Sequence, residues 1–451
     1  VLIFLQAGIG LYVIGSLYNI DQLLSAPWNG YNLQKPVFVF SRYLLDSSAL
    51  MLLPAIGLGM SFPILVKMIS GGYRHIGKET GQIYGVNTLG AISGSLLTGF
   101  LLIPKLGTQQ SLLLVATLNL LMMLFLFRTG DYFTKTLRKV MTVVLAGVIL
   151  IVNMGVPPDL LDRFFMRDSA GQKDIRKLIY FEEGLTDTVA IFKDDYGILD
   201  PDAKRLVTNG VSMSAVTFLA SRYMKLLAHI PIMLVDNPQD VLVVCFGTGQ
   251  TTGAAAIHPK VKTVDSVDLS ESVLKAGNVF ASQNYNALKN DKVRTFLTDG
   301  RNHLLTTQKM YDVITSEPPP PRTAFTVNLY TKEYYEMARQ RLNPGGVMAQ
   351  WVPLHSQGEN EVLMHFKTFL SVFPHAIAWM PVANEIIIIG SQNPININFA
   401  EIKKRFEDPV VSRFMEEIQV LDAFSFLSSI WFLEDQMSSL ARNQPVITDN
   451  K

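Results

Sequence analysis

Cysteine is nearly absent from this 451-residue sequence, which holds a single one, Cys245. One cysteine excludes an internal disulfide and any metal cluster built on several thiolates. Histidine, aspartate and glutamate form no group with the spacing of a metal site. An excess of charge is also missing, because 39 basic and 38 acidic residues leave a net charge of +1. We therefore expect neither a metal nor a nucleic-acid partner.

Charged residues are scarce in the first third of the chain, where long apolar runs dominate. A helix of about 20 apolar residues crosses the ~30 Å hydrocarbon layer of a bilayer. Five stretches are apolar enough, at approximately 1–19, 44–67, 83–104, 109–127 and 139–155. We predict that residues 1–155 form an α-helical transmembrane domain of about five spans. The chain opens at Val1 inside an apolar stretch without a cleavable signal, so we expect a protein truncated at its N-terminus.

Small and polar residues interrupt these apolar stretches. Gly90, Gly94 and Gly99 recur at a helical spacing that would allow close helix approach. Asp46 and Asn87 are polar side chains within predicted spans, where such residues line transport paths or lie near helix ends. Packing is the simpler interpretation, and a transport path is the alternative.

Residues 156–235 have the composition of a connector followed by a small β-sheet domain. Pro157 and Pro158 end the last apolar helix, and short alternating segments follow, one of them ending at the turn Asn209-Gly210. This pattern predicts a small antiparallel sheet. A helix is predicted at about 213–229, ending before Pro231.

Strands and helices alternate from residue 240, which is typical of a mostly parallel sheet covered on both faces. Strands are predicted at 241–246, 263–268, 293–297, 312–316, 346–351, 376–380 and 385–390. Seven strands that close with an antiparallel pair define the class I methyltransferase-type, Rossmann-like α/β domain, which we assign to residues 236–395. Residues 396–451 are predicted to form a C-terminal helical extension.

Glycines and acids follow successive predicted strands. Gly247-Thr248-Gly249 allows a tight turn and a close approach to a ligand, and Asp268 ends the next strand, where a carboxylate can bind ribose hydroxyls. Asp299-Gly300 follows the third strand and could accept from an adenine amino group. These residues predict a nucleoside site, against the alternative of solvated strand-end acids. Thr252 stands where a nicotinamide fingerprint has its third glycine, which disfavours that cofactor.

Glu317 follows the fourth predicted strand and precedes a proline run. A carboxylate there would face the reacting group of a bound nucleoside and could orient or deprotonate an amine. The alternative is a structural acid on a stiff loop. We expect His229 to have a cap or core role, whereas His355 is a weaker catalytic candidate.

The ordered motifs resemble those of spermidine synthases, and in particular the bacterial spermidine synthase-like proteins fused to an N-terminal multi-pass membrane domain. The segments that carry this resemblance are 84–91, 241–244, 267–270, Asp299-Gly300-Arg301, 311–314, Ser316-Glu317-Pro318, 328–335 and 344–347. The resemblance implies decarboxylated S-adenosylmethionine, or a related adenosyl nucleoside, as substrate. It also implies that Tyr223 and Tyr330 bind substrate, and that the protein lies in the bacterial inner membrane.

Departures from the family pattern concern the amine half of the site. Thr248 stands where the family has an aspartate that holds the aminopropyl amine, and Pro320 replaces the second aspartate of the catalytic loop. Thr186 replaces a glutamine, and Met224-Lys225 replaces His-Glu after Tyr223. Burying an ammonium group requires carboxylates. The sequence therefore indicates that most of the acidic amine pocket is lost.

Three functions remain open. The first is aminopropyl transfer to an amine such as a polyamine, with Glu317 as the catalytic residue. The second is an inactive scaffold or subunit of a membrane assembly, with protein partners or a second copy of the chain. The third is a transporter with a nucleoside-sensing domain. The basic residues that follow the second and fourth apolar stretches place those loops in the cytoplasm and the α/β domain on the far side, away from cytoplasmic nucleosides. The side of the membrane therefore stays open.

Overall fold

The computed structural model describes residues 1–20, 36–69, 76–130, 134–157, 160–161, 177–194, 200–323, 326–355 and 357–450. The chain divides into two compact units, which are described separately. One comprises Val1–Lys177 with Glu183–Leu185, and the other comprises Leu178–Glu182 with Thr186–Lys451.

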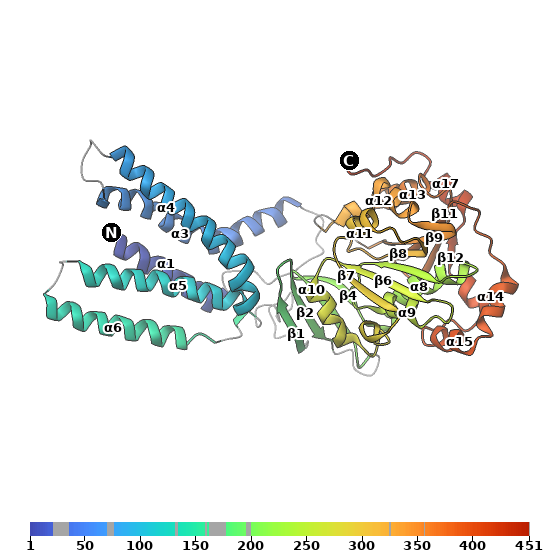
Figure 1. Cartoon of the computed structure of the whole chain (residues 1–451), viewed down its shortest axis with the longest axis horizontal. Helices are drawn as coiled ribbons and strands as arrows, with labels where there is room; N and C mark the ends of the chain where they lie inside the picture. Colours follow the sequence, from blue (N-terminus) through green and yellow to red (C-terminus); the bar gives the residue numbers. More distant parts are fainter. Residues whose placement is uncertain are drawn as a thin grey trace. The chain divides into compact units, whose positions relative to one another are not determined.

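The first unit is mainly helical from Leu2 to Met154 over its described residues, as Figure 1 shows in blue and teal. Its elements are α1 (Leu2–Tyr18), α3 (Pro36–Ile69), α4 (Ile76–Leu97), the π-helical turn η1 (Thr98–Leu102), α5 (Ile103–Thr129) and α6 (Lys135–Met154). Four of the five predicted apolar stretches each fall on one helix, whereas the stretch 83–104 covers the end of α4, η1 and the first residues of α5. Large apolar side chains such as Phe4, Phe100 and Ile151 are exposed on their surfaces. A helical unit that exposes apolar side chains in this way is consistent with a fused membrane domain.

Three helical segments among the described residues are long and apolar enough to cross a bilayer, namely Phe40–Ile69, Gly77–Thr129 and Lys135–Met154. The second of them has 53 residues. It would extend about 80 Å as one straight helix, far more than a bilayer needs. Gly107 interrupts it with φ 80° and ψ 164°, so the segment contains two helices joined at a kink. The prediction of about five spans stays a prediction.

The glycines singled out in the third apolar stretch do not mediate close packing among the described residues. A Cβ placed on Gly90, Gly94 or Gly99 would have no described neighbour within 4 Å. Close approach occurs instead at Gly10 of α1, where a Cβ would lie 2.7 Å from Cγ of Leu120 in α5. The space beside the three glycines is open among the described residues, so their role in helix packing stays a prediction.

A four-stranded sheet opens the second unit, in the order β1 (Lys177–Glu183), β2 (Thr188–Lys193), β3 (Lys204–Thr208) and β4 (Val211–Ala215). The pairs β2–β3 and β3–β4 are antiparallel. Asn209 and Gly210 join the latter pair with φ 50° and 79°, the left-handed geometry of a two-residue hairpin turn. The predicted small antiparallel sheet is confirmed.

Helix α8 (Phe218–Leu234) follows the small sheet and extends beyond its predicted end at Pro231. Proline in a helix deprives the carbonyl four residues earlier of its hydrogen bond. Here that carbonyl belongs to Leu227, and it accepts from Thr315 Oγ1 at 3.1 Å. The helix therefore continues, because a side chain of the neighbouring sheet replaces the missing donor. Arg222 of α8 donates from Nε to the carbonyl of Pro381 at 3.0 Å, and its Nη1 donates to the carbonyls of Ile418 and Gln419.

The main sheet has eight strands in the order β12-β10-β11-β9-β8-β5-β6-β7. Strands β5 to β9 run parallel, and β11 is antiparallel to both β9 and β10. This arrangement confirms the predicted methyltransferase-type class. The elements are β5 (Asp240–Val244), α9 (Gln250–Ile257), β6 (Thr263–Asp268), α10 (Glu271–Ala276), β7 (Val293–Leu297), α11 (Gly300–Thr306), β8 (Tyr311–Ser316), α12 (Lys332–Arg339), β9 (Leu342–Pro353), α13 (Glu359–Leu370), β10 (His375–Val382) and β11 (Glu385–Ser391).

The C-terminal segment contains helices and also one strand that the sequence did not predict. It holds α14 (Phe399–Phe406), α15 (Pro409–Glu416), α16 (Ala423–Leu427), β12 (Ile430–Phe432) and α17 (Glu434–Leu440). Strand β12 pairs antiparallel with the outer edge of β10. It makes eight strands where seven were predicted, and three residues are too few for a period-two pattern to be read.

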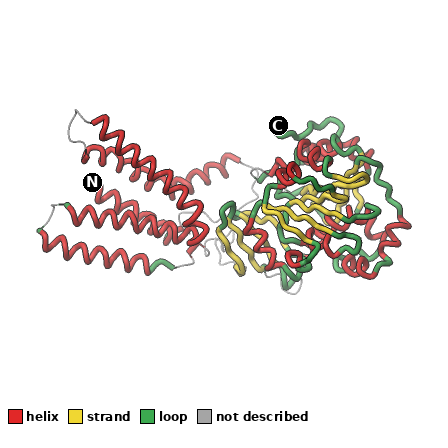
Figure 2. Tube along the Cα trace, in the orientation of Figure 1, coloured by secondary structure: helices red, strands yellow, loops and turns green. Residues whose placement is uncertain are grey.

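Helices cover both faces of the main sheet, which appears in Figure 2 as yellow strands between red helices. One face packs against α8, α9, α14, α15 and α16, with buried contacts such as Leu227 and Phe414. The other packs against α11, α12, α13 and α17, through residues such as Tyr335 and Phe366. Side chains of β5 alternate between the two cores, so helices cover both faces of this strand. Its carboxyl end is therefore the part of the strand that a ligand can approach.

Candidate functional site

The predicted site residues follow four adjacent parallel strands, β8-β5-β6-β7. Glu317 follows β8, Gly247 to Gly249 follow β5, Asp268 ends β6, and Asp299 follows β7. Parallel strands end at the same edge of a sheet, and a crevice outside their carboxyl ends is where open α/β sheets bind ligands. The structure therefore brings these residues to one edge of the domain.

The glycine loop after β5 is built from left-handed backbone. Cys245, Gly247 and Gly249 have φ values of 72°, 53° and 78°. A Cβ at Gly249 would lie 2.5 Å from Cζ of Phe246, and one at Gly253 would lie 1.9 Å from the carbonyl oxygen of Asn284. Glycine at 249 caps α9, and glycine at 253 lets α9 pack on the Asn284 backbone.

Thr248 lies between the two loop glycines and is buried. Its Oγ1 accepts from Gln250 Nε2 at 3.2 Å and lies 3.4 Å from Ser214 Oγ. Its carbonyl accepts from Asn284 Nδ2 at 2.9 Å. The hydroxyl therefore belongs to a neutral network, and Thr248 contributes no charge to the site.

Asp268 holds the glycine loop through its carboxylate. Oδ2 accepts from the backbone N–H of Phe246 at 2.8 Å, and Oδ1 accepts from that of Ser270 at 2.9 Å. Burial raises the pKa of Asp268, against the lowering effect of these hydrogen bonds. A carboxylate has about four acceptor positions. Backbone N–H groups of Ser270, Phe246 and Gly247 use three, so a ribose hydroxyl can still donate to Asp268.

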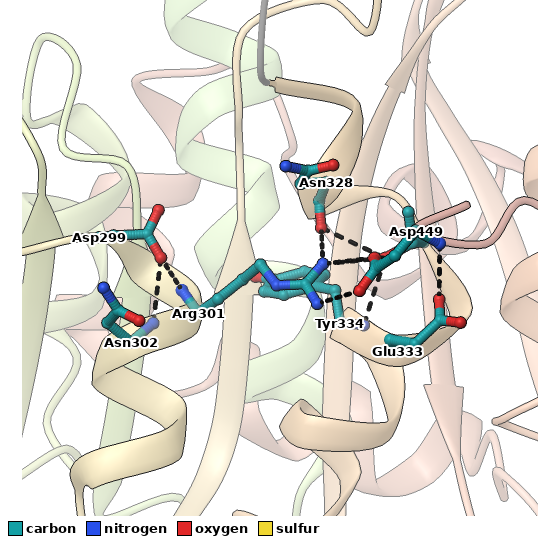
Figure 3. Close-up of polar contacts among 8 residues, drawn as sticks. Asp299, Arg301, Asn302, Asn328, Glu333, Tyr334 and Asp449 are labelled. Atoms are coloured by element: carbon teal, nitrogen blue, oxygen red, sulfur yellow. Dashed lines mark hydrogen bonds and ion pairs between the residues drawn. The ribbon is translucent and has the colours of Figure 1, made fainter. Parts of the chain in front are cut away.

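Asp299 caps helix α11, since its Oδ1 accepts from the backbone N–H groups of Arg301 and Asn302, both at 3.0 Å (Figure 3). In Figure 3 its other oxygen points away from the helix end. The neighbouring guanidinium of Arg301 donates to both carboxylate oxygens of Asp449 at 2.7 and 2.6 Å, and to the carbonyl of Asn328 at 2.8 Å. Arg301 thus fixes the chain around Asp299 and is itself neutralised.

The three acids all affect the pKa of the Cys245 thiol. Burial raises the pKa of its thiol well above the ordinary value, and the charges of Asp268, Glu317 and Asp299 raise it further. These carboxylates come from three different strands, yet all of them act on one side chain. The thiol is held in its protonated form, so it is not a nucleophile.

Glu317 is the most strongly perturbed acid of the group. Burial raises its pKa from 4.5 to about 7, and the nearby charge of Glu385 raises it as well. Hydrogen bonds from Tyr223 and Thr251 oppose this rise, the latter with Oγ1 3.1 Å from Oε2 of Glu317. A carboxyl group that titrates near neutral pH can both accept and release a proton during catalysis.

The two predicted substrate-binding tyrosines lie next to Glu317. Burial raises the pKa of Tyr223, and the charges of Glu317 and Glu385 add to the effect. Tyr330 is buried, and its hydroxyl lies 3.3 Å from the carbonyl of Pro318 and 3.4 Å from that of Pro319. Tyr223 therefore faces the acids, whereas Tyr330 holds the proline loop in place.

Sequence reasoning missed Glu385, the first residue of β11. Its pKa is raised by burial from 4.5 to about 7, and Trp351 Nε1 donates to its Oε2 at 2.7 Å. His355, the weaker catalytic candidate, has Nε2 3.5 Å from Oε1 of Glu385. The sequence signal was weak, because Glu385 is an isolated acid before an isoleucine run and no motif marks it.

The remaining departures from the family pattern form contacts within the domain. Lys225 is buried, and its Nζ lies 2.7 Å from the hydroxyl of Tyr285 and 3.3 Å from Oε2 of Glu417. Thr186 Oγ1 lies 3.3 Å from Oδ1 of Asp187, which accepts from Ser270 beside Asp268. His229 is buried and stacked on Phe414 with ring centroids 4.3 Å apart, which is the expected core role.

The strand order, the glycine loop and the strand-end acids are those of a methyltransferase-type α/β domain. Residues 220–397 match the family model described as "Spermine/spermidine synthase domain". The second half of the chain thus contains a domain similar to spermidine synthases, and apolar helices precede it.

Curated relatives are polyamine aminopropyltransferases. The protein from Methanocaldococcus jannaschii is 28% identical over 227 residues, which cover 47% of this chain and 74% of that protein. The protein from Oceanobacillus iheyensis is 28% identical over 302 residues, or 64% of this chain and 55% of its own length. Among solved structures, the spermidine synthase from Thermotoga maritima has a TM-score of 0.47 at 20% identity and covers 59% of this chain and 88% of its own.

Proposed function

We propose that the protein is a membrane-anchored aminopropyltransferase, which transfers the aminopropyl group of decarboxylated S-adenosylmethionine to an amine. The observation that carries this proposal is Glu317, a carboxyl group with a pKa of about 7 that follows β8 beside the strand ends bearing Asp268 and Asp299. The names of the curated relatives support the same reaction.

The roles of the residues follow from their chemistry. Asp268 accepts from the ribose hydroxyls, Asp299 accepts from the adenine amino group, and the loop from Gly247 to Gly249 allows close approach of the nucleoside. The neutral acceptor nitrogen forms a bond to the aminopropyl carbon beside the sulfonium. The C–S electron pair moves to sulfur, methylthioadenosine leaves, and the proton of the new ammonium passes to Glu317. Alignment supplies most of the acceleration in such a displacement.

Residues 1–155 would anchor the enzyme in the bacterial inner membrane through about five spans. The three long apolar helices support this part of the proposal. Residues 156–235, 236–395 and 396–451 would then form the connector with its small sheet, the catalytic domain and the C-terminal extension. Labelling a Leu305→Cys variant with an impermeant maleimide in intact cells tests the side of the membrane, since Leu305 is 58% exposed. The parent chain, with only the protonated Cys245, is the background control.

The activity is tested by incubating the purified full chain with decarboxylated S-adenosylmethionine and a series of amines. Release of methylthioadenosine that requires the amine and is lost in Glu317→Gln supports the proposal. Calorimetric titration with methylthioadenosine runs in parallel. Nucleoside binding without release would reject the transferase and favour a scaffold, whereas failure to bind the nucleoside would reject the site itself.

A further inference from the structure

The register of β11 places Glu385 at the edge of the sheet where the candidate site lies. Its partner across the antiparallel ladder is Pro353, the last residue of β9. Strand β9 lies beside β8, after which Glu317 follows. The beginning of β11 and the carboxyl ends of β9 and β8 therefore lie side by side. This arrangement places a second carboxylate next to Glu317 from a segment far along the chain.

One aromatic pair connects the two carboxylates. Tyr223 donates to Glu317 and stacks on Trp351, with ring centroids 6.1 Å apart and planes at 13°. The indole Nε1 of Trp351 donates to Oε2 of Glu385 at 2.7 Å. Both acids are thus fixed by the same two rings. Carboxylates combined with aromatic faces are the chemistry that proteins use to bind ammonium groups.

The charge of Glu385 has no permanent counter-ion in the described part of the chain. Its one ion-pair partner there is His355, and burial together with the charge of Arg322 lowers the pKa of that imidazole. The side chain of Glu385 is only 15% exposed. Holding two neighbouring carboxylates away from water is costly, and a cation bound between them would remove the cost.

An unpartnered acceptor lies at the start of α9, next to Thr251. Gln250 is buried, and its Nε2 donates to the carbonyl of Ala215 and contacts Sδ of Met224 at 3.2 Å. Its Oε1 has no partner among the described residues. Thr251 bonds to both the carbonyl of Met224 and Glu317. A buried acceptor without a donor is satisfied when a ligand supplies one, and an ammonium group supplies three.

We propose that Glu385 is a substrate-binding residue. Together with the Tyr223–Trp351 pair, it binds the non-reacting ammonium group of the acceptor, while Glu317 accepts the proton of the reacting nitrogen. This inference rests on the proposed function and names its acceptor as an amine with at least two nitrogens. A monoamine gains nothing from Glu385, so the residue sets the preference for diamines over monoamines.

The test compares Glu385→Gln with Glu434→Gln in the full chain. Glu434 also pairs with a histidine, His375, at 2.9 Å, but it lies on α17. Loss of one charge-assisted contact is expected to raise the KM for putrescine about 10- to 100-fold in Glu385→Gln. The KM for decarboxylated S-adenosylmethionine and the KM for butylamine stay within about 2-fold of the parental values, and Glu434→Gln behaves as the parent. Equal KM values for putrescine in parent and Glu385→Gln would overturn the inference and leave the transferase intact.

Direct binding separates the two proposals. Putrescine is titrated by calorimetry into the parent and both variants with methylthioadenosine at saturation. If the parent binds putrescine and Glu385→Gln does not, the ammonium subsite stands even where no turnover is found. If the parent and Glu385→Gln bind putrescine equally, the subsite is rejected whatever the activity.

Discussion

The hydroxyl of Thr251 lies 3.1 Å from Oε2 of Glu317 and 3.0 Å from the carbonyl oxygen of Met224. A hydroxyl has one proton, so it can donate to only one of these acceptors at a time. When Glu317 is protonated, its own O–H can donate to Thr251, which then donates to Met224. When Glu317 ionises, the two acceptors compete for the Thr251 proton. The state of Glu317 is therefore coupled to the contact between α9 and α8.

Replacing Glu317 by glutamine is expected to lower the kcat of aminopropyl transfer about 10²- to 10⁴-fold, because an amide cannot take the proton of the new ammonium. The measurement is methylthioadenosine release at saturating substrates. Glu336→Gln is the control, since Glu336 pairs with Lys332 on the surface of α12. A Glu317→Gln enzyme with parental kcat would show that another group accepts the proton.

The stability of the α/β domain is expected to fall between pH 5 and pH 8. Glu317 and Glu385 both have pKa values raised from 4.5 to about 7, so the folded state holds their protons more tightly than the unfolded state. Their contribution is complete below pH 4.5 and is lost as the pH rises through about 7. Thermal unfolding of the parent and of Glu317→Gln/Glu385→Gln measures it. The double variant should lose most of the slope, and an unchanged slope would contradict the raised pKa values.

Alanine at Gly253 is expected to destabilise the domain by about 2–4 kcal/mol, because its Cβ would meet backbone rather than a movable side chain. That contact is with the carbonyl oxygen of Asn284 at 1.9 Å. Gly147→Ala is the matched control, since a Cβ there has no described neighbour within 4 Å. Urea unfolding followed by circular dichroism compares the two variants. Equal stabilities would show that α9 can move away from Asn284.

Replacing Asp449 by alanine is expected to cost about 0.5–1 kcal/mol at low salt and less in 1 M NaCl. The Arg301 guanidinium holds the pKa of Asp449 below its usual range through two hydrogen bonds, but the carboxylate is 35% exposed. Asp202→Ala is the control, because its pair with Lys193 is 3.5 Å long and Asp202 is 76% exposed. Thermal shifts at both salt concentrations distinguish them. A salt-independent loss would indicate that Asp449 acts through packing.

The sequence predicted the parts of the fold that follow from local pattern. The apolar stretches correspond to helices and the alternation from residue 240 to the methyltransferase-type sheet, because burial on both faces leaves continuous apolar strands. The continuation of α8 through Pro231 could not be predicted, since it depends on Thr315 from another strand. Strand β12 is too short to carry a pattern, and it exists because β10 offers an open edge.

The candidate site was predictable where residues follow strands in sequence. Gly247, Asp268, Asp299 and Glu317 each come after an identifiable strand, so topology alone brings them together. Their roles in binding and catalysis stay predictions. Glu385 was not predicted, because its position depends on the antiparallel register of β11 with β9, which no local sequence signal specifies.

Hydrogen bonds from Arg222 to the carbonyls of Pro381, Ile418 and Gln419 link α8 to segments that are synthesised much later than the helix itself. Tyr223 is the next residue, so the phenol that contacts Glu317 is secured by backbone that emerges from the ribosome almost 200 positions later. A nascent chain stalled before residue 418 would carry every acid of the site and still lack the support that orients its central phenol. Orientation of Tyr223 therefore depends on residues far along the chain, whereas strand order alone places the acids.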